Sequence, residues 1–298
     1  MAQLLADGIR SDSERASGGI MKVYIHTDIE GVAGIVEWDP RNSRYTDIEK
    51  FEKRRVNSRL LTGEVNAAIA AAFDEGADTV YVNDSHGDCK TIDLEALDPR
   101  AELLHGMAST QPSWVPCLDE SFDCVVAVGM HAMAGSAYAS LPHSCWHIND
   151  DAFLLSEATM CAALAGTFGV PFVFASGDQT ITGEIREKIP ACEVAVVKEA
   201  LSPFFARTVH PTVARKRIYE GVRRGIARRK EIPPFVIPGP PYKVAASDRD
   251  PGVLISEAME GEDFFRLVHD YLNTFPWNDF GTQSVFSKVV DRGPYSKK

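Results

Sequence analysis

Two acidic residues separated by a single position, Asp28 and Glu30, lie at the end of a predicted strand that begins at Lys22. Side chains two residues apart on a strand point to the same side, so these two carboxylates would face one site. Open α/β sheets bind ligands beyond the carboxyl ends of their strands, which is where this pair falls. Gly31 then lets the backbone turn away without steric cost. Taken alone, however, the pair is also compatible with ordinary solvated loop residues.

Two histidines follow further predicted strands. His86 lies in the polar run at residues 83–88, and His131 comes directly after a valine-rich strand. Each is compatible with an ordinary loop histidine, but three strands that bring carboxylates and imidazoles to one sheet edge indicate a metal site. Neutral imidazoles and carboxylates suit Zn²⁺, Mn²⁺, Co²⁺ or Ni²⁺. The sequence therefore predicts a transition-metal centre at this edge.

Three more residues lie close to this group in the sequence. Glu157 opens a helical stretch, where a carboxylate is also favourable simply as a first-turn residue. His143 is compatible with a metal ligand, a general base or neither role. The role of His147 is left open.

Alternating β-rich runs and helical patterns predict the elements that position these residues. Helices are predicted at residues 57–75, 155–168, 179–188, 211–229 and 261–275. Strands are predicted at residues 22–28, 78–83, 102–105, 123–129, 144–148, 171–176 and 193–198. This alternation indicates an α/β fold with a three-layer, mostly parallel sheet that has helices on both faces, plus a smaller C-terminal α+β region.

The chain divides into three predicted parts. Residues 1–20 are polar and lack an apolar segment, so we expect a disordered N-terminal extension. Residues 21–200 form the predicted α/β metal-binding catalytic domain, and residues 201–298 form a smaller C-terminal region. The proline-rich run at residues 237–242 is incompatible with a helix or a central strand, so a linker or extended loop is expected there.

The composition argues against several classes of partner. A formal net charge of −11 argues against nucleic acid, although residues 215–230 are rich in arginine and lysine. We interpret that basic run as a solvated helix face or subunit contact rather than an anion-binding patch. No segment has the roughly 20 apolar residues needed to cross a membrane, and no signal peptide is found, so a cytoplasmic location is expected. The six cysteines form no C-x-x-C pair, which favours buried thiols over a cysteine zinc site.

Several short motifs occur in a fixed order along the chain. They are Asp-x-Glu-Gly at residues 28–31, Val-Asn-Asp-Ser-His at 82–86, Gly-x-His-Ala at 129–132, His-Ser at 143–144, Ile-Asn-Asp at 148–150 followed by Glu157, and Gly-Asp at 177–178. In this order they resemble the zinc-dependent D-aminopeptidase family of metallopeptidases. One departure is His26, where the family usually has a small hydroxyl residue; it would add a ligand or an outer hydrogen-bond donor. Beyond Lys198 the resemblance fades.

The resemblance implies a dinuclear zinc site in which Asp28 bridges two ions per subunit and His143 is the catalytic histidine. The metal ligands that it implies are Asp28, Glu30, His86, His131 and Glu157. It also implies an aminopeptidase that releases N-terminal D-amino acids from short peptides or amino acid amides, in a ring-shaped homo-oligomer for which a decamer is one candidate. Two alternatives stay open: a two-metal hydrolase of a non-peptide amide or another small substrate, and a non-catalytic small-ligand binding module.

Overall fold

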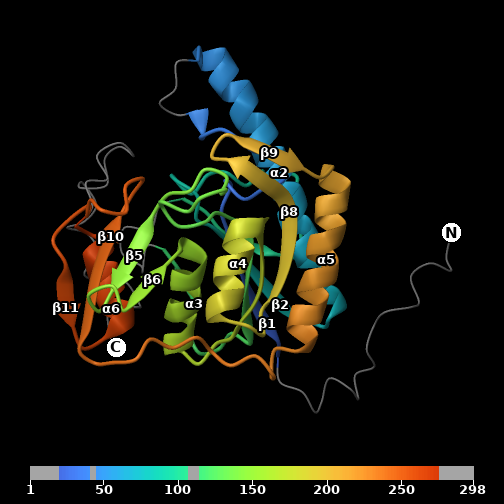
Figure 1. Ribbon diagram of the computed structural model, residues 1–298. Helices are drawn as coiled ribbons and strands as arrows, with labels where there is room; N and C mark the ends of the chain where they lie inside the picture. The colour runs from blue at the N-terminus through green and yellow to red at the C-terminus, as the bar shows by residue number, and fades with distance from the viewer. Residues whose placement is uncertain (1–19, 41–44, 107–113, 275–298) are drawn as a thin grey trace, which may run out of the picture.

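The computed structural model describes residues 20–40, 45–106 and 114–274 (Figure 1). The strands are β1 Lys22–Thr27, β2 Thr79–Asp84, β3 Glu102–Leu104, β4 Cys124–Met130, β5 Cys145–Ile148, β6 Phe153–Leu155, β7 Phe172–Asp178, β8 Glu193–Ser202, β9 Phe205–Thr208, β10 Tyr242–Ser247 and β11 Met259–Gly261. The helices are α2 Asp47–Asp74, α3 Glu157–Thr167, α4 Gln179–Lys188, α5 Pro211–Ala227 and α6 Phe264–Leu272. The extension predicted at residues 1–20 lies outside the described residues except for Ile20.

The larger sheet is built around β1. Its strand order, within the described residues, is β3-β2-β1-β4-β7-β8-β9. β1 pairs in parallel with β2 on one side and with β4 on the other. The chain moves outward from β1 to β2 and β3, then returns to the opposite side of β1 to form β4. The strand order therefore reverses between β1 and β4, and open α/β sheets leave a crevice for a ligand at such a point.

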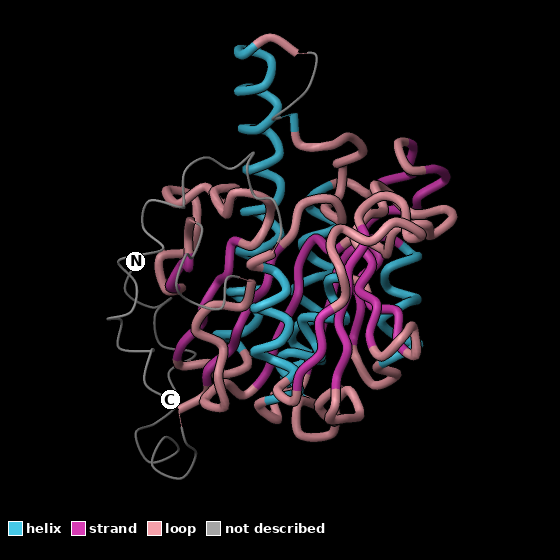
Figure 2. Tube along the Cα trace, turned by 90° about the vertical axis from the view of Figure 1, so that its left-hand side faces the viewer, coloured by secondary structure: helices cyan, strands magenta, loops and turns pink. Residues whose placement is uncertain are grey.

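Helices cover both faces of the larger sheet, which gives three layers (Figures 1 and 2). α2 and α5 pack together on one face, whereas α3 and α4 pack on the other. In Figure 1, β8 passes between α4 and α5. β9 departs from the parallel arrangement, because it returns antiparallel along β8. The predicted three-layer, mostly parallel α/β fold is confirmed.

α2 begins at Asp47, well before residue 57, where the apolar spacing predicted its start. Its first turn is defined by a capping box, in which the side chains of Thr46 and Glu49 each accept a hydrogen bond from the other's backbone. The buried face starts only at Leu61, and the first turns extend away from the sheet (Figure 1). Apolar spacing therefore detects only the part of the helix that packs on the sheet.

A smaller antiparallel sheet joins two distant parts of the chain, in the order β11-β10-β5-β6 within the described residues. α6 packs against β10 and β11 and also contacts α3. The smaller α+β region is thus present, but its strands come from both sides of residue 200, and α5 packs on the larger sheet. The exact domain division stays a prediction.

Half of the eight basic residues between Arg215 and Lys230 pair with an acidic side chain, namely Lys216, Arg223, Arg224 and Arg228. Arg223 lies against Glu75, while Arg224 and Arg228 both contact Glu193. This pairing favours a solvated helix face over an anion-binding patch. All six cysteines are free thiols, and four of them are buried. Among the residues that the structure describes, no helix is long and apolar enough to pass through a membrane.

Candidate metal centre

The loop after β1 is pressed against the end of β4, where the strand order reverses. The backbone N–H of Asp28 donates to the Val128 carbonyl (2.9 Å), and that of Gly31 donates to the Gly129 carbonyl (2.8 Å). A Cβ atom on Gly31 would lie only 1.9 Å from the carbonyl oxygen of Met130. Gly31 is therefore required for the close approach of two backbones, rather than for the turn expected from the sequence.

Asp28, Glu30 and His86 form the first cluster of potential metal ligands. All three are buried. The His86 Nδ1 atom lies 3.0 Å from Asp28 Oδ1 and 3.3 Å from Glu30 Oε2. On the other side of the ring, His86 Nε2 lies 3.5 Å from the carboxylate of Asp39, a residue that the sequence analysis missed. The loops after β1 and β2 thus bring two carboxylates and one imidazole together, as predicted.

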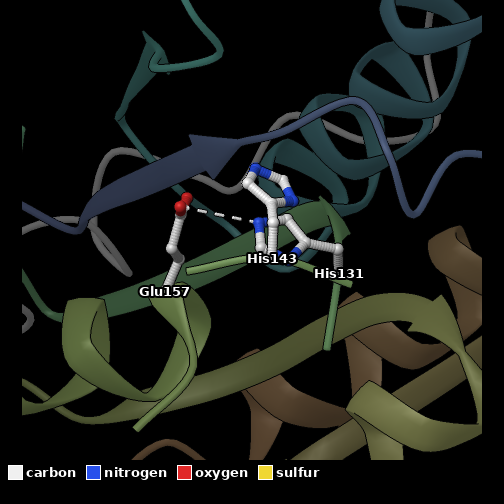
Figure 3. Close-up of side chains that lie close together, drawn as sticks. All are labelled: His131, His143 and Glu157. Carbon is white, nitrogen blue, oxygen red and sulfur yellow. Dashed lines mark ion pairs between the residues drawn. The ribbon is translucent and has the colours of Figure 1, made fainter. Parts of the chain in front are cut away.

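His131, His143 and Glu157 form the second cluster (Figure 3). The His131 Nε2 atom lies 3.6 Å from Glu157 Oε1, and the rings of His131 and His143 stack with centroids 3.8 Å apart. Glu157 is the first residue of α3, directly after the N-cap Ser156. Glu157 is therefore a first-turn residue of a helix, and it is also compatible with a metal ligand, because the first helical turn points its carboxylate at His131.

Hydrogen bonds orient both histidines of this cluster. The Nδ1 atom of His131 lies 2.9 Å from the Ala132 carbonyl oxygen, and that of His143 lies 3.0 Å from the Leu141 carbonyl oxygen. A carbonyl can only accept, so Nδ1 carries the proton in each ring. In the neutral imidazoles Nε2 is therefore left as a lone-pair donor to a metal or as a proton acceptor.

Asp28 connects the two clusters. Its Oδ1 atom faces His86, while its Oδ2 atom lies 3.4 Å from His131 Nε2. Asp28 Oδ2, Glu30 Oε2 and His131 Nε2 are buried and form no hydrogen bond of ordinary geometry within the described residues. Each such atom costs about 1–3 kcal/mol when left without a partner. Carboxylate oxygens and imidazole nitrogens are zinc ligands, so the residues of both clusters fit zinc.

The pKa values of the clustered carboxylates and histidines depend on their burial and on their charged neighbours. Burial raises the pKa of Asp28, and the neighbouring Glu30 carboxylate raises it further. Burial alone would lower the pKa of His131, but the Glu157 and Asp28 carboxylates outweigh it and raise that pKa. Protons and metal ions thus compete for the same atoms, and metal binding would release protons.

Lys198, to which no role was assigned from the sequence, holds the loop that carries the first cluster. It lies on β8, is buried, and its Nζ atom donates to the carbonyl oxygens of Glu30 and Ile35. A lysine is almost never fully buried without partners. Its position inside a predicted buried strand, directly after Val196 and Val197, was the signal that could have identified it.

Two further side chains hold the same loop. Glu64 on α2 accepts a hydrogen bond from the Ala33 N–H (3.0 Å), and Thr208 on β9 accepts one from the Gly34 N–H (2.9 Å). Glu64 is buried in the middle of the longest helix described. The loop is therefore fixed by β4, β8, β9 and α2 together.

His26 lies outside both clusters. Its Nδ1 atom accepts from the Asn83 side-chain amide (3.1 Å), and its Nε2 atom lies 3.2 Å from Ser85 Oγ. Burial lowers the pKa of His26 to about 4, so the ring is neutral. His26 contacts the residues just before His86, which supports the expected role of an outer hydrogen-bond donor rather than that of a ligand.

His147 also lies outside both clusters. It contacts Asp151 through Nδ1 (2.7 Å) and Ser247 through Nε2 (3.0 Å), which are the atoms that a Ser-His-Asp triad uses. Ser247, however, is fully buried, whereas Asp151 is exposed. A nucleophile must reach its substrate, so this arrangement ties β5 to β10 rather than serving catalysis.

Three matches to known proteins bear on the family of this chain. A family model described as D-aminopeptidase, peptidase M55, matches residues 21–251. A D-aminopeptidase of Bacillus subtilis strain 168 is 30% identical over 230 residues, which cover 74% of this chain and 79% of that protein. The fold is shared with the zinc-dependent D-aminopeptidase DppA from Bacillus subtilis, a self-compartmentalizing protease, with a TM-score of 0.74, 24% identity, and coverage of 88% of this chain and 99% of DppA. The chain therefore belongs to the D-aminopeptidase family, peptidase M55.

Proposed function

We propose that this protein is a dinuclear zinc aminopeptidase that releases N-terminal D-amino acids from short peptides or amino acid amides. The observation that carries the proposal is the position of Asp28, whose two carboxylate oxygens face His86 and His131 respectively. Family membership supports peptide hydrolysis, and the names of the Bacillus subtilis relatives support zinc and the preference for D-residues.

The two clusters supply a complete set of ligands for two ions. Asp28, Glu30 and His86 would hold one ion, and Asp28, His131 and Glu157 would hold the other. The same donors also suit Mn²⁺, Co²⁺ or Ni²⁺. Bound zinc supplies Lewis-acid polarisation of the scissile carbonyl and makes water more acidic.

We assign proton transfer to His143. Its Nδ1–H is held by the Leu141 carbonyl, so Nε2 is the free proton acceptor. Burial and the adjacent His131 lower the pKa of His143, which favours the neutral imidazole. A water oxygen bonds to the carbonyl carbon, the C–N bond breaks, and His143 passes the proton from water to the leaving amine. The imidazole is neutral again at the end, and the products are an amino acid and a shortened peptide or amine.

We also propose a ring-shaped homo-oligomer in the cytoplasm, with the sites facing an inner cavity. The support is the description of DppA as a self-compartmentalizing protease. Light scattering coupled to size-exclusion chromatography tests the assembly. A single mass of ten subunits would support the decamer, whereas a monomer would contradict the ring.

Metal analysis and a substrate panel test the reaction. We expect two equivalents of zinc per subunit, loss of activity on chelation, and recovery when zinc is restored. The panel compares D- and L-alanine amide, a D-alanyl dipeptide, a simple amide and a phosphoester. Preferential hydrolysis of the simple amide or the phosphoester would favour the alternative two-metal hydrolase. A protein that holds metal but hydrolyses none of these would contradict the proposal and favour a binding module.

A further inference from the structure

A tryptophan contacts the histidine to which we assign proton transfer. The ring of Trp38 meets that of His143 edge-on, with centroids 5.1 Å apart. Among the described residues, Trp38 has ring contacts with His143 and Phe204 but none with His131. His143 therefore contacts both His131 of the candidate metal centre and Trp38, and so connects the two rings.

A cation lies on this tryptophan. The guanidinium carbon of Arg249 is 4.7 Å from the centre of a Trp38 ring, which is within the range of a cation–π contact. Arg249 is exposed and forms no ion pair with a carboxylate within residues 20–40, 45–106 and 114–274. Its neighbour Asp250 is turned into its own loop, where it accepts from the Gly252 N–H (2.9 Å). Arg249 is thus held in place by an aromatic ring, while its N–H donors remain available to an anion.

The proposed reaction indicates which part of the substrate lies along these residues. The leaving amine must come within about 2.6–3.2 Å of the group that protonates it, so the leaving residue lies against His143. Extended chain spans at most about 3.3–3.6 Å per residue. The two ring distances keep the guanidinium within about 10 Å of the His143 ring. A leaving group of one to three residues therefore places its terminal carboxylate near Arg249.

We propose that Trp38, Phe204 and Arg249 form a leaving-group subsite, which takes a short peptide with a free α-carboxylate. Phe204 is 57% exposed and lies 6.2 Å from Trp38, so the two rings offer an apolar surface for the leaving side chain. The guanidinium fork binds the carboxylate. This inference rests on the proposed function, and it makes short peptides with a free terminus better substrates than capped peptides.

A matched pair of substrates tests the subsite. The purified zinc-loaded protein is given D-alanylglycine and the same dipeptide capped as a C-terminal amide, and kcat/KM is measured for both. We expect the free dipeptide to be preferred by about tenfold, the size of one charge-assisted hydrogen bond. In Arg249→Gln this ratio should fall to about one, and Arg249→Lys should keep part of it because lysine retains the charge but not the fork. Arg266→Gln, which removes an exposed arginine of α6, is the matched control and should keep the wild-type ratio.

The possible outcomes distinguish a failure of the proposed subsite from a failure of the proposed function. A wild-type protein that hydrolyses neither dipeptide contradicts the proposed aminopeptidase itself. A wild type that hydrolyses both equally well overturns the subsite alone. Equal losses on both substrates in Arg249→Gln would also overturn it, because a merely structural role of Arg249 does not change the ratio. The zinc content and the circular dichroism spectrum of each variant identify losses that come from metal or folding.

Discussion

Replacing the buried Lys198 by methionine should weaken zinc binding without unfolding the protein. Methionine has a similar length and no charge, so it fills the space between β8 and the loop after β1. The substitution removes two hydrogen bonds, to the carbonyl oxygens of Glu30 and Ile35, and leaves both acceptors without this partner. Lys198 thus holds the backbone of Glu30, whose side chain is a proposed zinc ligand.

The size of the effect follows from these two contacts. A hydrogen bond from a charged donor contributes about 1.5–3 kcal/mol. Part of that loss is offset, because burial disfavours the cation and lowers the pKa of Lys198 to about 8. Loss of a residue that orients a ligand typically weakens metal binding by about 10–100-fold. We therefore expect the zinc Kd of Lys198→Met to rise by at least about tenfold, equivalent to about 1.4 kcal/mol.

Competition with a chromophoric zinc chelator measures this Kd, and thermal unfolding of the metal-free protein measures the accompanying loss of stability. Thr208→Val removes one neutral hydrogen bond from the same loop, to Gly34, and should have a smaller effect. Lys243→Met removes a partly exposed lysine paired with Asp150 and serves as the control. A folded Lys198→Met protein whose zinc affinity stays within about twofold of wild type would refute the reasoning, because the effect expected of such a residue is at least about tenfold.

Three other substitutions test separate parts of the site. Asp28→Asn should reduce both zinc equivalents, since the proposed bridging carboxylate would serve both ions; retention of one tightly bound ion in metal analysis would contradict the bridge. His143→Ala should lower kcat by about 10²–10⁴-fold at unchanged zinc content, whereas joint loss of metal and activity would make His143 a ligand. Burial raises the pKa of Glu64 from 4.5 to about 7, so the folded protein keeps a proton that the unfolded chain has lost. The free energy of unfolding should therefore fall as the pH rises from about 4.5 to 7, and Glu64→Gln should flatten this slope in thermal melts; an unchanged slope would show that Glu64 does not titrate there.

Fully buried strands were predictable because each is a short run of β-branched and apolar residues. β1, β2, β4 and β7 lie close to their expected ranges, and two of them, β4 and β7, are buried along their whole length. β6 and β11 have only three residues each, and β9 is mostly exposed, so none of them has a periodic apolar pattern. The smaller sheet was therefore only partly predictable, although its strand β5 begins two residues after His143.

The kind of chemistry was predictable from the types of residue at the ends of the strands. Asp28 and His131 come directly after strands, and Glu30 and His86 lie within three residues of a strand end. Parallel strands bring such residues to one edge of the sheet. Glu157 was less certain, because a first-turn glutamate has an equally good local explanation. Only the packing of α3 against β4 and β7 shows that its carboxylate faces His131.

The sequence by itself thus determined the fold class, the residue types of the candidate ligands and the sheet edge at which they lie, since all three depend on local pattern and on the direction of neighbouring strands. The tertiary structure decided which residues support the ligands. Lys198 reaches Glu30 across 168 positions of sequence, and Arg249 reaches Trp38 from the loop after β10. No local pattern encodes these contacts, because they arise only when separate layers of the fold pack together.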